Sequence, residues 1–439
     1  MTLVLAWNNV RTNRMGFAAS FAAVIFAVTL VGGSGLVVVA ASARDELNGV
    51  MGLLVLSAVV SGFVSVFVVA GTLSLHVLRQ RRTWGLLRSV GMTPRQVSRL
   101  IMAEALVVAV LASVAGCLLA VPYAALMAAF MRMTGLAPAG VPVEATTGPF
   151  VLALVVGVAV TLLAARVATR KAVGVGPLEV LRDSAAQRRL LPWPRAVVGV
   201  AALAGGGELL FLVPQQVKAS VVAPMALGAT MALCVGASAL GPVVLRGMGW
   251  LLGAVVAWLD PGAGMLARSS LVTQPRRAMA AASPVMLTVA LACTFLFAVA
   301  TTDVAAGVIR TGPSAWVAPM LVGSTVVYTV ISVLNSTAMT MGERAEEIRL
   351  LRTVGTKPRQ LTRMVCWEML IVTCTGTLLG TGIAAASLTA LGRATTGEPW
   401  FAYSLPQYAG LVLVCVVSGL AGGLVATRRA RRGSLLLDG

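Results

Sequence analysis

The sequence predicts an all-α integral membrane protein of about ten transmembrane helices, arranged 4+2+4 with parallel internal repeats. Three observations predict this fold class: the composition, a series of long apolar runs, and a polar segment that occurs twice. Of the 439 residues, 58% are hydrophobic and only 11% are charged. Soluble domains carry about 25% charged residues. A single soluble globule of this composition would lack the polar surface needed to cover its core.

Ten apolar runs are long enough, at roughly 18 residues or more, to cross a bilayer as helices. We place them at 16–42, 51–77, 100–130, 148–168, 196–214, 220–245, 280–302, 316–340, 362–391 and 405–427. No A-x-A-like cleavage site follows the first run, so we expect a retained span rather than a signal peptide. The order of the runs predicts a first four-helix repeat (1–170), a connector with two extra spans (171–263) and a second four-helix repeat (264–439).

The basic residues lie mostly on one side of the predicted membrane. The formal net charge is +19, and our loop assignment puts 29 of the 34 Lys and Arg residues on one side. The exceptions are Arg44, Arg132, Lys218, Arg310 and Arg393. Because basic loops stay in the cytoplasm, this pattern predicts a multi-pass protein with both termini cytoplasmic, and it argues against a nucleic-acid partner. The excess of arginine over lysine favours a bacterial source, and hence the bacterial cytoplasmic membrane.

A polar, basic segment occurs twice, at an offset of 264 residues. The first copy reads LLRSVGMTPRQ and the second reads LLRTVGTKPRQ. Apolar residues recur in each copy at helical spacing, and a glycine then ends the predicted helix. The apolar positions and glycines are Trp84, Leu87, Val90 and Gly91 in the first copy, and Ile348, Leu351, Val354 and Gly355 in the second. Each copy stands between the second and third spans of its half, so the halves run parallel.

A turn follows each of these predicted helices and leads into the next span. In the first copy, Thr93 is the expected N-cap, Pro94 the first helical residue, and Gln96 the second half of a capping box. The second copy keeps the proline and the glutamine, as Pro358 and Gln360. Lys357 replaces the capping threonine there, so we expect a weaker cap, with Thr356 as the alternative capping residue. An ordinary basic connector lying on anionic lipid is the simpler alternative, but it would not need these residues in register.

This pattern resembles the FtsX/MacB-type permease domain of ABC transporters, present twice. That domain has four spans, with an E-I-x-x-L-R-x-x-G-type segment between its second and third. The matching residues are Glu347, Ile348, Leu351, Arg352, Gly355 and Gln360 in the second copy, and Leu87, Arg88, Gly91 and Gln96 in the first. The first copy departs from the pattern, with Thr83-Trp84 in place of Glu-Ile. The resemblance covers about 16–170 and 264–432.

The resemblance implies a permease subunit that couples ATP hydrolysis by separate ATPase subunits to the export of an amphiphilic or hydrophobic substrate. In that family the repeated segment is a coupling helix that docks in a groove of the ATPase. Two copies would recruit two ATPases, which would hold the ATP and Mg²⁺, and this chain would bind no cofactor. The short predicted outer loops favour a cargo that enters from the membrane or the cytoplasm. The alternatives are an FtsX-like signalling permease that moves no cargo and an ion-coupled secondary transporter.

The sequence offers little for chemistry within the chain itself. It contains no G-x-x-x-x-G-K-[ST] loop, so we expect no ATPase site, and its single histidine and scattered acids predict neither a catalytic nor a metal site. The substrate-binding residues are not identifiable. We expect Glu104 and Glu368 to pair with nearby arginines, and Glu208 to reach the outer interface.

Two further segments carry structural expectations. Gly247–Leu259 is apolar but short, so we expect an interfacial helix, with a short or re-entrant span as the alternative. Gly376 and Gly380 form a small-residue motif whose counterparts are Ala112 and Gly116, and both pairs predict close helix packing.

Overall fold

The computed structural model describes residues 14–43, 48–80, 91–133, 146–173, 192–216, 219–308, 318–323, 326–327, 330, 333, 356 and 358–435. Within these residues the chain is helical, without any β-strand, and nine helices are long and apolar enough to cross a membrane. The predicted all-α membrane fold is therefore confirmed. Most of the predicted span 316–340 lies outside the described residues, so the 4+2+4 order stays a prediction.

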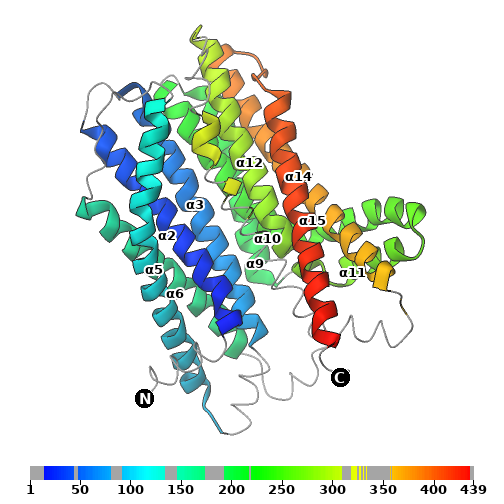
Figure 1. Cartoon of the computed structure of the whole chain (residues 1–439). Coiled ribbons are helices and arrows are strands. Elements are labelled where there is room, and N and C mark those ends of the chain that lie inside the picture. The colour runs from blue at the N-terminus through cyan, green and yellow to red at the C-terminus, as the bar shows by residue number, and fades with distance from the viewer. Residues whose placement is uncertain are drawn as a thin grey trace. The chain divides into compact units, whose positions relative to one another are not determined.

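The chain forms two compact units, and unit 1 comprises Met1–Arg188 and Thr311–Thr325. Its helices are α2 (Arg14–Ser42), α3 (Asn48–Arg79), α5 (Pro94–Met133) and α6 (Thr147–Val173), drawn in blue to green in Figure 1. Helix α2 packs against the other three. Gly116 of α5 lies so close to α2 that an added Cβ would come within 2.8 Å of the Ile25 carbonyl oxygen. This crossing therefore needs the glycine.

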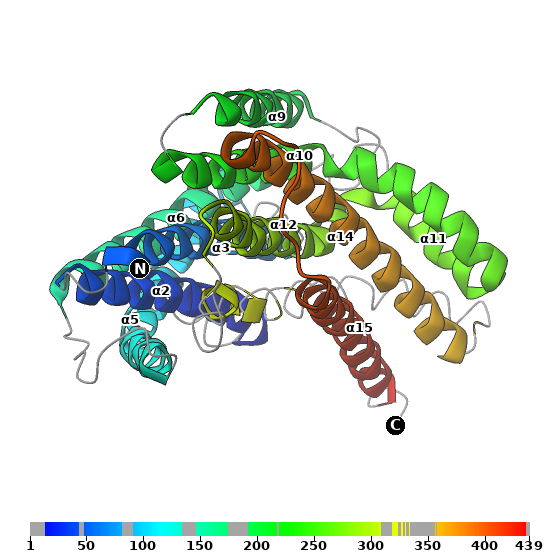
Figure 2. The same cartoon turned by 90° about the horizontal axis from the view of Figure 1, so that it is seen from above.

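Unit 2 comprises Arg189–Arg310 and Val326–Gly439. Its elements are α9 (Trp193–Leu212), the 3₁₀ turn η2 (Val213–Gln215), α10 (Ala219–Leu259), α11 (Ala263–Thr273), α12 (Pro275–Ala305), α14 (Pro358–Thr396) and α15 (Leu405–Leu435). Helix α12 packs against α10, α14 and α15 and is buried along almost its whole length; Figure 2 shows it between α10 and α15. The two predicted connector helices, α9 and α10, thus belong to the same compact unit as α12, α14 and α15.

Helices α12 and α14 cross through the predicted glycine motif. An added Cβ at Gly376 would lie 2.9 Å from the Ala282 carbonyl oxygen, and one at Gly380 would lie 2.7 Å from that of Met286. Both contacts advance in the same direction along the two helices, so α12 and α14 run parallel. The expectation of close helix packing is confirmed at Gly376, Gly380 and Gly116.

Hydroxyl groups bridge the buried helices of unit 2. The Thr230 hydroxyl of α10 donates a hydrogen bond to Ser387 Oγ of α14 at 2.8 Å, and Thr294 Oγ1 of α12 lies 3.3 Å away. All three side chains are fully buried. Such hydroxyls connect transmembrane helices without placing a charge in the bilayer.

An arginine replaces a hydrogen-bond donor that a proline removes from α10. Pro242 has no N–H, so the Ser238 carbonyl four residues earlier loses its helical donor. Arg195 of α9 replaces that donor, because its Nη2 donates to the Ser238 oxygen at 3.0 Å and its Nε to the Ala239 oxygen at 2.9 Å. This side chain of α9 thereby gives a hydrogen-bond donor to the carbonyl that the proline leaves without one in α10.

The structure corrects the predicted end of the span 220–245, while the interfacial position expected for Gly247–Leu259 stays a prediction. These residues do not form a separate helix after a span ending at residue 245, because α10 continues unbroken from Ala219 to Leu259. The next proline after Pro242 is Pro261, which disfavours helical geometry at Asp260, and the helix ends at Leu259. The following helix, α11, was not predicted, and it packs back against the end of α10.

Candidate functional site

The first predicted docking turn has the local structure expected from its sequence. Gly91 adopts a φ of +104°, which side chains other than glycine rarely tolerate. The Thr93 N–H donates to Gln96 Oε1 at 2.9 Å, and the Gln96 N–H donates to Thr93 Oγ1 at 3.3 Å. Helix α5 begins at Pro94. The predicted capping box is confirmed, and it fixes the direction in which α5 leaves the turn.

The helices predicted to precede the two turns lie outside the described residues. This applies to Trp84, Leu87, Arg88 and Val90 in the first copy, and to Glu347, Ile348, Leu351, Arg352, Val354 and Gly355 in the second. Their helical form and their role in docking stay predictions. The described part of each site is the start of the helix that follows.

The start of α5 is held by helices of its own unit. Val97 and Ile101 are buried against Val77 of α3 and Ala168 of α6. Around this apolar contact, Arg95, Gln96 and Arg99 are exposed. The turn therefore offers a polar, basic surface on a helix end that is firmly packed from behind.

The start of α14 has a different neighbour. Helix α14 begins at Pro358, and its residues Leu361 and Met364 are buried against Ala263 and Ala267 of α11. A Cβ added to Gly262, at the tip between α10 and α11, would lie 4.0 Å from Gln360 Nε2. The hairpin of α10 and α11 thus reaches the second predicted turn itself.

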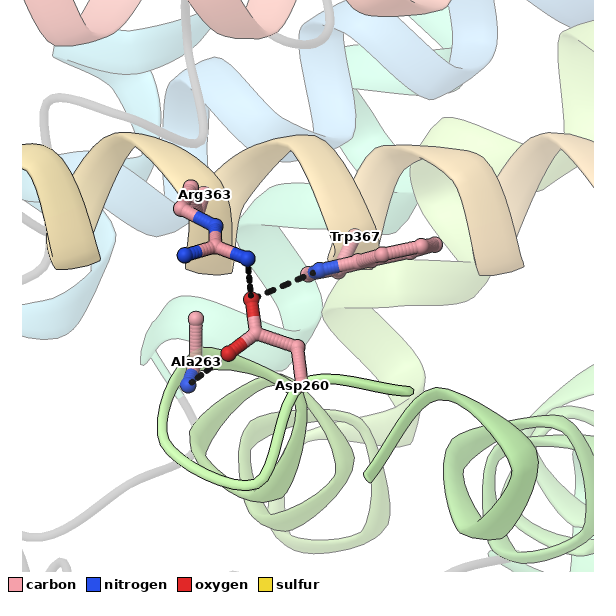
Figure 3. A network of polar contacts seen from close by, with 4 residues as sticks. All are labelled: Asp260, Ala263, Arg363 and Trp367. Atoms are coloured by element: carbon pink, nitrogen blue, oxygen red, sulfur yellow. Dashed lines mark hydrogen bonds and ion pairs between the residues drawn. The ribbon is translucent and has the colours of Figure 1, made fainter. Parts of the chain in front are cut away.

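A carboxylate joins this hairpin to α14, as Figure 3 shows. Asp260 Oδ2 accepts a hydrogen bond from Trp367 Nε1 at 3.1 Å and lies 2.9 Å from Arg363 Nη2. Its Oδ1 accepts a bond from the N–H of Ala263, the first residue of α11, at 3.3 Å. The Asp260 side chain is only 10% exposed, whereas that of Arg363 is 64% exposed. Asp260 thereby binds the first N–H of α11 and the side chains of two residues of α14.

Neither Asp260 nor Trp367 belongs to the site residues expected from the sequence. A signal was present, because Asp260 is the only acid between Arg246 and Arg268 and stands directly before the Pro261-Gly262 break. Its partners could not be inferred, because Arg363 and Trp367 lie more than 100 residues away.

The other titratable side chains do not form part of the exposed surface of either turn. Glu104 and Glu368 occupy equivalent positions in α5 and α14, and both are buried. His76 is also buried, with its Nε2 3.1 Å from Gln80 Nε2, while Glu208 is exposed. In the part of the chain that the structure describes, no three His, Cys, Asp or Glu side chains come close enough to hold a metal ion.

Comparison with known families adds an independent finding. A model described as "FtsX-like permease C-terminal" matches the chain twice, at residues 55–177 and 319–435. The two matches begin 264 residues apart, which is the offset that relates the two docking turns. Together they span more than half of the chain. No curated protein matches this chain.

Proposed function

This chain belongs to the FtsX-like permease family, and we propose that it is the membrane-spanning subunit of an ABC transporter, driven by separate ATPase subunits. The family match and the nine long apolar helices among the described residues support a multi-pass permease-type membrane protein. The proposal adds that the two repeated segments are coupling helices, each the docking point for one ATPase. ATP and Mg²⁺ would then bind to the ATPases, and the basic side of the chain, with both termini, would face a bacterial cytoplasm.

The observation that carries the proposal is the construction of the two turns. Each predicted coupling helix leads into a long helix that is fixed near its start. The Thr93–Gln96 capping box fixes the start of α5, and Asp260, at the tip of the hairpin, binds α14 near its start. A docking element can transmit force only if it cannot pivot freely on the helix behind it.

The helix pairs behind the turns suit the transmission of movement. Gly116 brings α5 into backbone contact with α2, and Gly380 brings α14 into backbone contact with α12. Packed helices of this kind move as rigid bodies or slide by small steps. ATPase closure would therefore displace α5 together with α2, and α14 together with α12.

We further propose that the cargo is amphiphilic or hydrophobic and is exported. The support is the short predicted outer loops and the buried hydroxyl contacts that join α10, α12 and α14. Strains with and without the gene should differ in resistance to amphiphilic compounds or in lipid profile. Identical resistance and identical lipids would count against this cargo.

The docking role is tested by co-purification of an ABC ATPase with the full chain from native membranes. Changing Leu87 with Gly91, or Leu351 with Gly355, to Ser and Ala should reduce the bound ATPase, and changing all four should remove it. A matched control replaces Glu398 and Tyr403, which are exposed between α14 and α15, by alanine. Undiminished ATPase binding in the fourfold variant, with normal membrane insertion, would overturn the docking role.

The same preparation separates the alternatives. In liposomes, an exporter's ATPase activity should rise with an amphiphilic substrate. A signalling permease would hydrolyse ATP without moving any tested cargo, and transport that persists without ATPase would indicate an ion-coupled transporter.

A further inference from the structure

The end of α10 reaches well beyond what a membrane crossing requires. Its 41 residues would extend about 61 Å at 1.5 Å per residue, roughly twice the 30 Å thickness of the hydrocarbon core. The exposed Arg246 stands where the crossing should end. The residues after it, Gly247–Leu259, must therefore either project into water or follow the membrane surface.

This segment has two unlike faces. The inner face packs against α11: an added Cβ at Gly249 would lie 3.2 Å from Leu271 Cβ, and one at Gly253 would lie 2.7 Å from Arg268 Cγ. The opposite face, here called the outer stripe, consists of Trp250, Leu251, Val255, Trp258 and Leu259. These side chains are 57–83% exposed, and no charged residue interrupts them. A contiguous apolar stripe of this size is rarely left in contact with water.

The two ends of the hairpin indicate its direction. At its base, Gly241 of α10 packs against Met279, and at its tip Asp260 binds Trp367. Met279 and Trp367 both lie within the first three turns of their helices, and α12 and α14 run parallel. Base and tip therefore lie near the same depth, which is the arrangement of a hairpin along a membrane surface. Figures 1 and 2 agree, since the end of α10 and α11 project sideways from α12.

Arginines flank the stripe. The Arg268 guanidinium lies over the Trp250 ring, 5.5 Å from its centroid, and Arg246 is exposed at the start of the segment. Tryptophan prefers the boundary between acyl chains and headgroups, while arginine stems lie along apolar surface with their charge at the phosphates. The stripe and its two arginines have the chemistry of a helix that lies in the interface.

We propose that the outer stripe is a lipid-binding surface, embedded in the headgroup boundary of the leaflet nearest the second predicted docking turn. Its occupant is phospholipid, because the stripe continues a membrane-spanning helix and offers no charged side chain that would orient a protein partner. Through Asp260, this anchor holds the start of α14 at a fixed depth. The lipid contact needs only membrane insertion, whereas its consequence for docking rests on the proposed function.

The test places single fluorescent probes on the two sides of the hairpin. In a background with all six native cysteines replaced, Trp258→Cys and Leu251→Cys report on the outer stripe, and Ser269→Cys on the exposed side of α11 is the matched control. Each variant is labelled with a small environment-sensitive dye and reconstituted into phosphatidylcholine–phosphatidylglycerol liposomes without any ATPase. Nitroxide-labelled lipid quenches probes in the bilayer, and iodide quenches probes in water.

We expect both stripe probes to be quenched several-fold more by shallow nitroxide lipid than the Ser269→Cys probe, and to be shielded from iodide. Iodide access at all three positions would overturn the proposal, since the hairpin would then project into water. Lipid quenching of all three without iodide access would overturn it in favour of a re-entrant segment. Stripe probes that lose iodide access only when ATPase is added would identify a protein partner instead. Because the liposomes hold no ATPase, failure of docking leaves this result unaffected.

Discussion

The starts of α5 and α14 share the sequence Pro-Arg-Gln but are held in place differently. The first is held by a local capping box and by Val97 and Ile101 packing within unit 1. In α14, Val365, the counterpart of Ile101, packs with Met369 and Leu420. The added feature is the hairpin of α10 and α11, joined through Asp260. The start of α5 is thus fixed by a local cap, and the start of α14 by the Asp260 contact, here called the tether. Local substitutions should therefore affect the two turns unequally.

The largest expected loss of stability comes from changes at the close glycine crossings, which both units contain. Gly116→Val and Gly380→Val should each lower the free energy of unfolding by about 3 kcal/mol, because overpacking against a backbone carbonyl cannot relax easily. Denaturant unfolding in detergent micelles measures the change. The matched control is Gly382→Val in α14, where an added Cβ meets nothing within 4 Å. Equal losses at 382 and 380 would show that close packing is not the cause.

The tether should give the next largest effect. Asp260→Ala should cost about 2 kcal/mol, chiefly because the Trp367 and Ala263 N–H groups lose a buried acceptor. Asp260→Asn should cost less, since an acceptor oxygen remains. Denaturant unfolding should be combined with the accessibility of a cysteine at position 360, which should rise in Asp260→Ala. An unchanged accessibility at 360 would mean that the hairpin does not hold the second turn.

The cap should matter in the first copy. Thr93→Ala should cost about 1 kcal/mol, the usual value of an N-cap. Thr356→Ala is the comparison in the second copy, and we expect a smaller loss because Lys357 occupies the position of the capping threonine. The same unfolding assay suffices, and equal losses would remove this difference between the turns.

The smallest expected loss of stability comes from the equivalent arginines Arg363 and Arg99. Arg363→Ala should cost at most about 1 kcal/mol, because Arg363 is mostly exposed and the ion pair is screened by solvent. Arg99 occupies the equivalent place, and among the described residues it has no ion pair, so Arg99→Ala should change stability less. High salt should abolish the difference between the two variants. A difference that survives in high salt would indicate lost packing rather than lost charge.

Local chemistry made parts of this structure predictable from sequence. The start of α5 followed from Thr93, Pro94 and Gln96, whose interactions span three residues. The glycine crossings followed from small residues at helical spacing. Family membership followed from the repeated segment, and it is shown by the two family matches. The roles of the predicted coupling residues remain to be measured.

The features that could not be predicted from the sequence depend on contacts between distant residues. Nothing near Gly247 indicates that α10 continues, because glycine and apolar residues are compatible with either a helix or a break. Asp260 looked like an isolated acid until folding brought Arg363 and Trp367 to it across more than 100 residues. Such pairings depend on the tertiary packing of α11 on α14 and leave no periodic pattern.

The contact between Arg195 and α10 has a consequence for the biogenesis of the protein. Synthesis runs from the N-terminus, so Arg195 is made before Ser238 and Pro242 are. When α10 follows, Arg195 is already present to donate to the Ser238 carbonyl. The newly made helix therefore need not leave that carbonyl unpaired. Helices α9 and α10 should therefore be inserted as a pair, and α9 acts as a folding template for the helix made after it.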